Sequence, residues 1–275
     1  MSAAVCDLEG RSLLAIFAHP DDESLAAGGL LACCAARGAG VSLLCLSRGE
    51  AGPGGAAPSG TGPGSSDPGD LGDIRERELR DAAATLGLAD VLLRSHPDGM
   101  LPWLPAGTLE HEVRTVIVDR RPDVVVTFGE DGLYWHPDHI ATYEATRAAV
   151  AWLDHGAPAL FYVTIPPGQM RGVLDAAGPR LPAGARRDLL GIDEPDAFGA
   201  AAQPPTMVFR SGRFAERKLA ALRCHRSQVA GGPFDHLDPA EAEALLGVEH
   251  YRRAEVGSTA PAFIERLAGS TLETA

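Results

Sequence analysis

Positive charge is scarce in this chain of 275 residues. Lysine and arginine together number 24 against 37 aspartates and glutamates, so the formal net charge is −13 at pH 7. Proteins that bind nucleic acid or an anionic membrane surface use cationic side chains to neutralise phosphates. The charge balance therefore argues against both kinds of partner.

Long apolar runs and a targeting signal are also missing. A helix that crosses a bilayer needs about 20 predominantly apolar residues, and no segment of this chain reaches that length. No basic N-terminal segment with an apolar stretch and a cleavage site is visible. We therefore expect a cytoplasmic protein, whose oligomeric state, a homo-oligomer included, stays open.

Cysteine is sparse, and its placing argues against a disulfide framework. The five cysteines are odd in number, and none forms a C-x-x-C pair. Cys33, Cys34 and Cys45 fall in segments that we expect to be core elements. The cysteines are therefore interpreted as small buried apolar residues in a reducing compartment.

Apolar runs alternate with helical patterns along most of the chain. Apolar runs that end abruptly in polar residues are typical of buried strands, and the stretches between them carry helical periodicity. This alternation predicts an α/β fold with a mostly parallel sheet and helices on both faces. The predicted strands are 13–17, 41–47, 89–94, 123–128 and 160–165, with one more at 206–209.

Other segments lack a clear pattern. Residues 51–69 are rich in glycine, proline and serine, so we expect a loop, and both a lid and a plain insertion stay open. Residues 168–205 are expected to wrap the same rim of the sheet and to shape a substrate pocket. The end of the chain is expected to hold a helix over 239–247 and peripheral packing.

A polar cluster follows the first predicted strand. His19-Pro20-Asp21-Asp22-Glu23 comes directly after the apolar run 13–17 and opens a helix that continues to Ala36. Open α/β sheets bind ligands at the carboxyl ends of their strands. Acidic residues are also common in the first turn of any helix, because the N–H groups there carry partial positive charge. Taken alone, the cluster fits a helix cap as well as a metal site.

A second polar cluster decides between these two interpretations. Tyr134-Trp135-His136-Pro137-Asp138-His139 follows the apolar run 124–128 and again opens a helical pattern. Two clusters of histidines and carboxylates, each at the end of a predicted strand, are hard to explain as packing. We therefore predict one metal site that draws on both clusters.

Two further histidine segments are weaker candidates. In His96-Pro97-Asp98-Gly99 a glycine replaces the second carboxylate of the first cluster, so the segment lacks the ligand spacing. Asp98 lies on the same rim and is a candidate for holding a polar substrate. His225 is interpreted as a histidine at a helix end and not as a ligand.

Three side chains of the two clusters form a suitable set of metal ligands. A hydrolytic metal site needs several fixed protein ligands and an open position for water or substrate. His19, Asp22 and His139 supply two imidazoles and one carboxylate. The set suits zinc best, although it also suits Fe(II). Bound zinc lowers the pKa of its water to about 7 and so supplies hydroxide at neutral pH.

The remaining polar residues of the clusters suggest roles in catalysis. Asp21 is adjacent to a ligand and is the natural general base. Tyr134 and His136 are placed to offer an O–H and an imidazolium to the oxyanion and the departing amine. Asp138 is expected to orient or charge one of the histidines.

Together these motifs resemble the zinc-dependent PIG-L/LmbE-like N-acetylglucosaminyl deacetylases, which include enzymes of the mycothiol and bacillithiol pathways. The resemblance runs from about residue 13 to 230 and includes Gly49-Glu50, Arg75-x-x-Glu78-Leu79, Asp98-Gly99 and His225-Arg226-Ser227-Gln228. It implies a Rossmann-like fold and removal of an N-acyl group, N-acetyl first of all, from a glucosamine-containing small molecule. It also implies one domain over 1–275, with a core over 1–166 and an elaboration over 167–275 that shapes the substrate pocket.

The resemblance also assigns roles to individual residues. It implies one Zn²⁺ per chain, with Asp21 as the base. Tyr134 would polarise the amide carbonyl, and His136 would stabilise the transition state or protonate the amine. Arg75 and Asp98 match positions that grip the sugar or its aglycone in the mycothiol-pathway members. The implied metal ligands are His19, Asp22 and His139.

Several alternatives stay in view. A nucleotide-binding Rossmann protein would carry glycines after the first strand, where this chain has the His-Pro-Asp-Asp-Glu motif. A non-haem Fe(II) oxygenase could use the same ligands, but it usually has an all-β scaffold. A catalytically silent sugar-binding relative would not need the base and the oxyanion donors. Within the hydrolases, an amidase acting on thiol-sugar conjugates or on an antibiotic-pathway intermediate is the runner-up.

Overall fold

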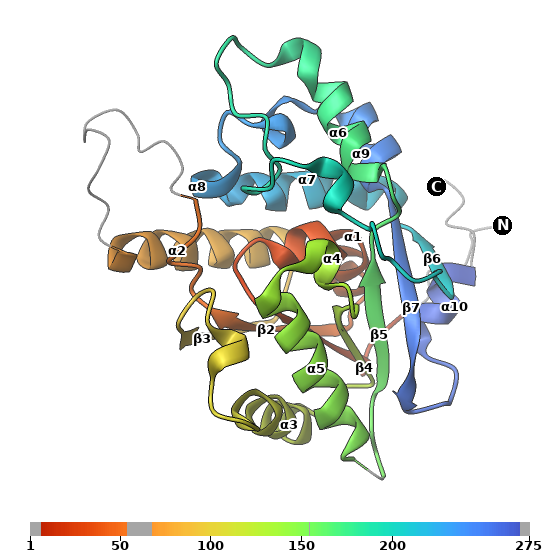
Figure 1. Cartoon of the computed structure of the whole chain (residues 1–275). Coiled ribbons are helices and arrows are strands. Elements are labelled where there is room, and N and C mark those ends of the chain that lie inside the picture. The colour runs from red at the N-terminus through yellow and green to blue at the C-terminus, as the bar shows by residue number, and fades with distance from the viewer. Residues whose placement is uncertain (1–6, 54–67, 154, 270–275) are drawn as a thin grey trace, which may run out of the picture.

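One twisted sheet of seven strands forms the centre of the computed structural model, which describes residues 7–53, 68–153 and 155–269 (Figure 1). The strand order is β3-β2-β1-β4-β5-β7-β6. The first five strands in the chain are parallel, and β7 runs antiparallel to both β5 and β6. The strands are β1 Ser12–Phe17, β2 Gly40–Ser47, β3 Asp90–His96, β4 Val124–Phe128, β5 Ala159–Thr164, β6 Met207–Arg210 and β7 Val248–Gly257.

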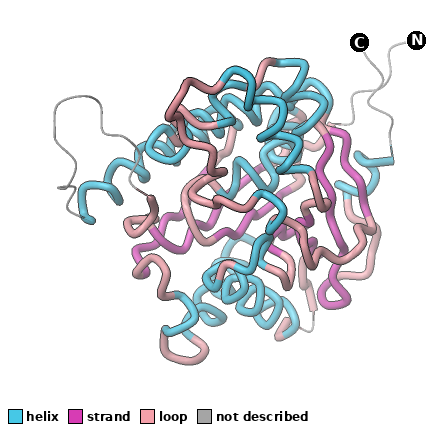
Figure 2. The backbone as a smooth tube through the Cα atoms, turned by 45° about the horizontal axis from the view of Figure 1, so that its top comes forward, coloured by secondary structure: helices cyan, strands magenta, loops and turns pink. Residues whose placement is uncertain are grey.

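Helices cover both faces of this sheet, so the predicted α/β class with a mostly parallel sheet is confirmed. Figure 1 shows α1, α2 and α7 on one face and α3 and α5 on the other, and Figure 2 shows the strands as a layer between helices. The longer helices are α1 Asp22–Ala36, α2 Pro68–Leu86, α3 Thr108–Arg120, α5 Pro137–Ala151, α6 Gln169–Ala177, α7 Ala215–Cys224, α9 Pro239–Leu246 and α10 Phe263–Gly269. The short ones are α4 Gly132–Trp135, α8 Arg226–Val229 and the 3₁₀ turns η1 Leu101–Trp103, η2 Gly178–Arg180, η3 Pro195–Ala197, η4 Gly212–Phe214 and η5 Pro233–His236.

The central strands are apolar because both of their faces are buried. All five residues of β4 and all six of β5 are buried, as parallel strands between two helical layers must be. Helix α1 packs against β1, β2, β5 and β7, and its buried alanines and glycines have small side chains that let it approach the sheet closely. The two polar clusters follow the ends of β1 and β4.

The last strand of the sheet in chain order departs from the sequence prediction. The strand predicted at 206–209 is confirmed as β6, but the sequence predicts no strand over 248–257, and the tail beyond Arg253 was expected to be peripheral packing; residues Val248–Gly257 instead form β7. The sequence of β7 is rich in charged residues, although one of its faces is partly buried. Glu249 and Tyr251 are buried, and the Glu249 carboxylate accepts a hydrogen bond from Lys218 Nζ at 2.7 Å. Because the buried Glu249 is paired with Lys218, β7 can bury a charged residue, and its sequence lacks the apolar pattern that predicts a strand.

The segments without a pattern are partly structured. Within 51–69, residues 54–67 lie outside the described part of the chain, and α2 begins at Pro68. Within 168–205 lie α6, η3 and an antiparallel bridge between Leu189 and Ile192. In the described ranges, no helix combines the length and the apolar character needed to cross a membrane.

Candidate metal centre

The two polar clusters meet because their strands are neighbours in the sheet. β1 pairs in parallel with β4, with Leu13 opposite Val124, so both strands deliver their carboxyl ends to the same edge. His19 lies in the turn between β1 and α1, and His139 lies in the first turn of α5. The sequence order strand, polar turn, helix therefore places side chains that are 120 positions apart in one site.

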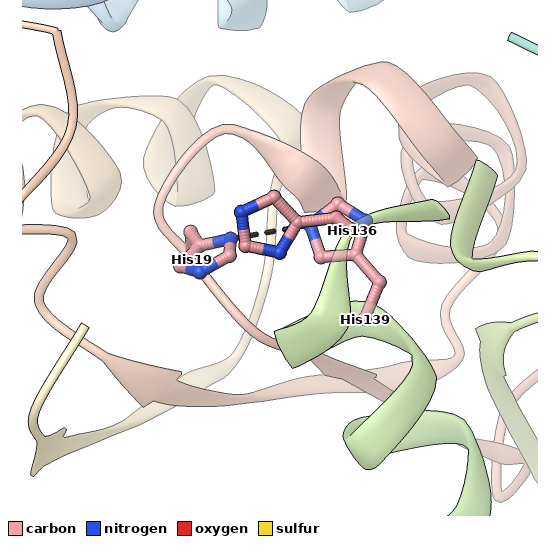
Figure 3. A group of neighbouring side chains, drawn as sticks. All are labelled: His19, His136 and His139. Carbon is pink, nitrogen blue, oxygen red and sulfur yellow. Dashed lines mark hydrogen bonds between the residues drawn. The ribbon is translucent and has the colours of Figure 1, made fainter. Parts of the chain in front are cut away.

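The three predicted ligands lie within mutual contact distance. His19 Nδ1 is 3.2 Å from His139 Nε2 and 3.4 Å from Asp22 Oδ2. His139 Nε2 is in turn 3.2 Å from Asp22 Oδ1. Figure 3 draws these two imidazoles and marks the contact between them with a dashed line. All three side chains are buried, so the cluster is shielded from bulk water.

The hydrogen bonds on the far side of each imidazole fix which nitrogen carries its proton. His139 Nδ1 lies 3.1 Å from the Gly132 carbonyl oxygen, and this contact requires a proton on Nδ1. His19 Nε2 lies 3.2 Å from Asp138 Oδ2 and 3.0 Å from Asp98 Oδ1, and these contacts require a proton on Nε2. In the neutral tautomers assigned in this way, the two facing nitrogens both present lone pairs. Such a pair, beside a carboxylate, needs a cation between its members, and the donor set fits a divalent metal ion.

Protonation equilibria point in the same direction. Burial alone would lower the pKa of His19, but hydrogen bonds to Asp138, Asp22 and Asp98 raise it well above its ordinary value. Burial lowers the pKa of His139 to about 3. Burial would raise the pKa of Asp22, but the nearby His139 and His19 hold it well below its ordinary range. The site therefore favours a positive charge beside its ionised carboxylates, and either a proton or a metal ion can supply that charge.

Asp21, the predicted base, is held in an unusual backbone conformation. Its φ of 112° lies in the left-handed region, where a non-glycine residue carries strain of about 1–3 kcal/mol. The peptide is restrained from several sides, because its N–H donates to Glu23 Oε2 at 3.1 Å and its carbonyl accepts from Ser24 and Leu25. The strain turns the backbone so that consecutive carboxylates, Asp21 and Asp22, meet different partners.

Arg75 is the partner of the Asp21 carboxylate. Its Nη2 donates to Asp21 Oδ2 at 2.9 Å and to the Pro20 carbonyl at 2.5 Å, and its Nη1 donates to the Gly49 carbonyl at 2.8 Å. The Arg75 side chain is buried. Burial raises the pKa of Asp21 to about 7, although the adjacent guanidinium opposes the shift. Arg75 therefore holds the Asp21 carboxylate, and its hydrogen bonds run to protein groups.

His136 and Tyr134 border the same centre. The His136 ring lies 4.8 Å from that of His19 and 4.6 Å from that of His139, so its nitrogens belong to the same candidate ligand cluster (Figure 3). Its Nδ1 accepts a hydrogen bond from the Asp138 N–H at 3.2 Å. Burial and the neighbouring His19 lower the pKa of His136, and burial raises that of Tyr134 well above its ordinary value. Near neutral pH both side chains are therefore uncharged donors.

Two carboxylates from other strand ends complete the surroundings of His19. Asp138 is fully buried and accepts hydrogen bonds from the N–H groups of Gly99 and Leu101 at 2.8 and 3.1 Å. Asp98 follows β3, and its Oδ2 accepts from the Ala51 N–H at 2.9 Å. Asp98 thus belongs to the site, whereas His96 of the same segment contacts Glu112 Oε2 on α3.

Sequence reasoning missed a buried pair beneath the site. His225 Nε2 lies 2.8 Å from Glu23 Oε1, and both residues are inaccessible to solvent. His225 lies outside the metal cluster, as predicted, but it fixes Glu23, whose other oxygen holds the Asp21 peptide. The only sequence signal for this pair was that both residues belong to motifs of the same resemblance. Their 202-residue separation hid the contact.

Comparison with protein families finds a match for about half of the chain. Residues 14–150 match the family model described as PIG-L, GlcNAc-PI de-N-acetylase. The matched range contains most of β1, all of β4 and both polar clusters. A curated relative from Acidothermus cellulolyticus, 1D-myo-inositol 2-acetamido-2-deoxy-alpha-D-glucopyranoside deacetylase, is 32% identical over 261 residues and covers 88% of each chain.

Solved structures share the fold over most of the chain. The N,N'-diacetylchitobiose deacetylase from Pyrococcus horikoshii has a TM-score of 0.60 at 20% identity and covers 90% of this chain and 87% of its own. GalB, the 4-carboxy-2-hydroxymuconate hydratase from Pseudomonas putida, has a TM-score of 0.60 at 17% identity and covers 91% and 99%. A deacetylase and a hydratase on one scaffold mean that activity must be argued from the site and not from the fold.

Proposed function

This chain belongs to the PIG-L family of de-N-acetylases, and we propose that it is a zinc-dependent hydrolase that removes an N-acetyl group from a glucosamine-containing small molecule. The observation that carries the proposal is the 3.2 Å approach of His19 Nδ1 to His139 Nε2 beside the Asp22 carboxylate, with a second carboxylate, Asp21, immediately before Asp22 in the chain. The curated relative acts on a 2-acetamido glucopyranoside, as its name states.

His19 Nδ1, Asp22 and His139 Nε2 would hold the metal. When bound, a zinc ion polarises a carbonyl oxygen and lowers the pKa of water to about 7. Two imidazoles and one carboxylate also suit Fe(II), but hydrolysis of an amide requires no redox chemistry. Zinc is therefore the proposed metal, and the choice can be tested by metal analysis.

Asp21 would accept the proton of the attacking water. A base of pKa near 7 combines a useful ionised fraction with enough basicity at neutral pH. Arg75 would keep the Asp21 carboxylate aimed, because its guanidinium also grips the Pro20 and Gly49 carbonyls. After taking the proton, Asp21 can pass it to the departing amine. Arg75 and Asp98 also remain the proposed contacts to the sugar or its aglycone.

Tyr134 and His136 would stabilise the oxyanion that forms during attack. The high pKa of Tyr134 keeps its O–H protonated, as a hydrogen-bond donor must be. His136 Nδ1 accepts the Asp138 N–H, which leaves Nε2 to carry a proton. Its lowered pKa favours the neutral donor over the imidazolium, so stabilising the oxyanion is its proposed role. Asp138 would orient His19 through Nε2.

The proposal is tested by loading the purified chain with zinc and measuring acetate and free amine from a panel of N-acetylglucosamine glycosides. We expect acetate release that stops after chelation and returns when zinc is added. Release only from thiol-sugar conjugates or an acylated antibiotic intermediate would favour the amidase alternative. Oxygen consumption with iron, and no acetate from any amide, would contradict the proposal.

A further inference from the structure

Tyr134 lies in a strained turn. Its neighbours Leu133 and Trp135 have φ values of 65° and 66°, and Tyr134 itself has φ −151° and ψ 33°, far from helical values. Large side chains avoid positive φ, and they keep it only where the surrounding structure leaves no alternative. The direction of the Tyr134 ring therefore depends on what restrains this turn.

Most restraints on the turn are local. Asp131 accepts hydrogen bonds from the Trp135 N–H at 2.8 Å, through its carbonyl, and from the Leu133 N–H at 3.2 Å, through its side chain. His139 Nδ1 lies 3.1 Å from the Gly132 carbonyl oxygen. These hydrogen bonds fix the backbone on both sides of Tyr134, but none of them involves its ring.

A segment distant in the chain, residues 198–199, contacts both the turn and the Tyr134 ring. The Gly199 N–H donates to the Leu133 carbonyl at 2.8 Å, and the Phe198 ring lies 4.8 Å from the Tyr134 ring at an interplanar angle of 56°. The Tyr134 ring also lies 5.2 Å from the ring of His139 and 5.8 Å from that of His136. Tyr134 thus contacts both Phe198 and a proposed metal ligand.

The segment that carries Phe198 is itself tightly fixed. Phe198 is only 1% exposed, so its ring cannot move without opening the core. Gly199 has a φ of 73°, and a Cβ there would lie 1.9 Å from the Ile165 carbonyl oxygen. Only glycine can pass so close to the end of β5. Phe198 is therefore held in place from behind.

We propose that Phe198 is a positioning residue for Tyr134, and that the segment after η3 acts on turnover by holding the Tyr134 ring against the metal centre. The proposal rests on the proposed role of Tyr134 as the donor to the substrate carbonyl. It gives residues 198–199, which carry no catalytic side chain, a function in the chemical step. It also links the pocket-shaping region to kcat as well as to substrate choice.

A double-mutant cycle tests this inference. Zinc-loaded wild type, Phe198→Leu, Phe198→Ala, Tyr134→Phe and the two double variants are compared for kcat, KM and zinc affinity. We expect Phe198→Ala to lower kcat by about tenfold, because small misplacements of a catalytic group are costly, with KM and zinc affinity nearly unchanged. Phe198→Leu should retain more activity, since it keeps most of the packing. In the Tyr134→Phe background, neither Phe198 change should lower kcat further.

The outcomes separate this inference from the proposed function. If the losses multiply in the double variants, or if Phe198→Leu and Phe198→Ala both keep full kcat, Phe198 does not act through Tyr134. Full activity of Tyr134→Phe would overturn the proposed role of Tyr134 and this inference with it. Phe209→Leu is the matched control, because Phe209 is equally buried but lies in β6, and its kcat should stay at the wild-type level. If Phe198→Ala does not fold, the cycle with Phe198→Leu decides alone.

Discussion

His19 has both of its ring nitrogens committed, and this single residue links the parts of the site. Its Nδ1 faces His139 and Asp22, while its Nε2 lies between the carboxylates of Asp138 and Asp98. Carboxylates behind a metal-binding imidazole fix its tautomer and increase its basicity. The strength of metal binding should therefore depend on residues that do not contact the metal.

Asp138→Asn tests this dependence at the level of one oxygen atom. The change keeps the shape of the side chain but removes the charge opposite His19 Nε2. We expect zinc affinity to fall by about 10- to 100-fold, as is common when such a partner is lost, and competition with a chromophoric chelator measures it. Glu110→Gln on α3 is a control for the loss of one negative charge outside the site. Equal affinities of Asp138→Asn and wild type would contradict the assigned tautomer.

Asp21 is predicted to be needed for turnover but not for the metal. Asp21→Ala should keep stoichiometric zinc, because the three proposed ligands remain, and should lower kcat by about 10²- to 10⁴-fold, the usual contribution of a general base. Zinc content by atomic absorption and acetate release are measured on the same sample. A fully active Asp21→Ala variant would show that another group serves as the base.

At the scale of elements, the ends of β1 and β4 position the residues of the site, and β7 joins β5 to β6 in the sheet. Glu249 in β7 accepts hydrogen bonds from Lys218 Nζ, from the Tyr251 hydroxyl and from two N–H groups of α1, those of Gly29 and Leu30. This buried carboxylate joins β7 to α7 and α1. Its loss of a partner should be costly, because an uncompensated charge would stay in the core.

Lys218→Met is expected to lower the free energy of unfolding by about 3–5 kcal/mol, since Glu249 loses its cationic partner in the core. Urea unfolding followed by circular dichroism measures the change. The exposed neighbour Arg217 provides the control, and Arg217→Met should stay within about 0.5 kcal/mol of wild type. Equal stability of the two variants would mean that water reaches Glu249.

The same elements show what the sequence could and could not predict. The apolar runs 13–17 and 124–128 predicted β1 and β4, and the polar residues that follow them predicted the site. Both predictions rest on patterns of residues that are close together in the sequence. The strand β7 was not predicted, because Glu249 and its ion pair interrupt the apolar pattern. The contacts of Phe198 and of the Glu23–His225 pair were not predicted either, because they join segments far apart in the chain and leave no local sequence pattern.

At the scale of the whole molecule, the sheet is completed by strands from the last part of the chain. β6 and β7 follow residue 167, yet β7 pairs with β5 over Ala159 to Thr164. We propose that residues 1–275 act as one domain, with the core over 1–166 dependent on the remainder. A chain cut after residue 166 would expose the edge of β5 and the face of α1 that contacts α7.

Truncation after residue 166 is therefore expected to give a chain that does not fold cooperatively. Thermal unfolding by circular dichroism and the elution volume in size-exclusion chromatography, each compared with the full chain, check this expectation. A sharp unfolding transition of the truncated chain at the temperature of the full chain would contradict it. Such a result would divide the protein into two independent units.

A zinc titration of the metal-free chain against a competing chelator tests most directly whether His19, Asp22 and His139 bind one divalent cation. We predict one tight site per chain in the wild type and a loss of at least about 100-fold in affinity for His139→Ala, which removes one of three ligands. His111→Ala, a change of an exposed histidine on α3, should bind like the wild type. A wild-type chain without a tight site, or a His139→Ala variant with unchanged affinity, would contradict this prediction.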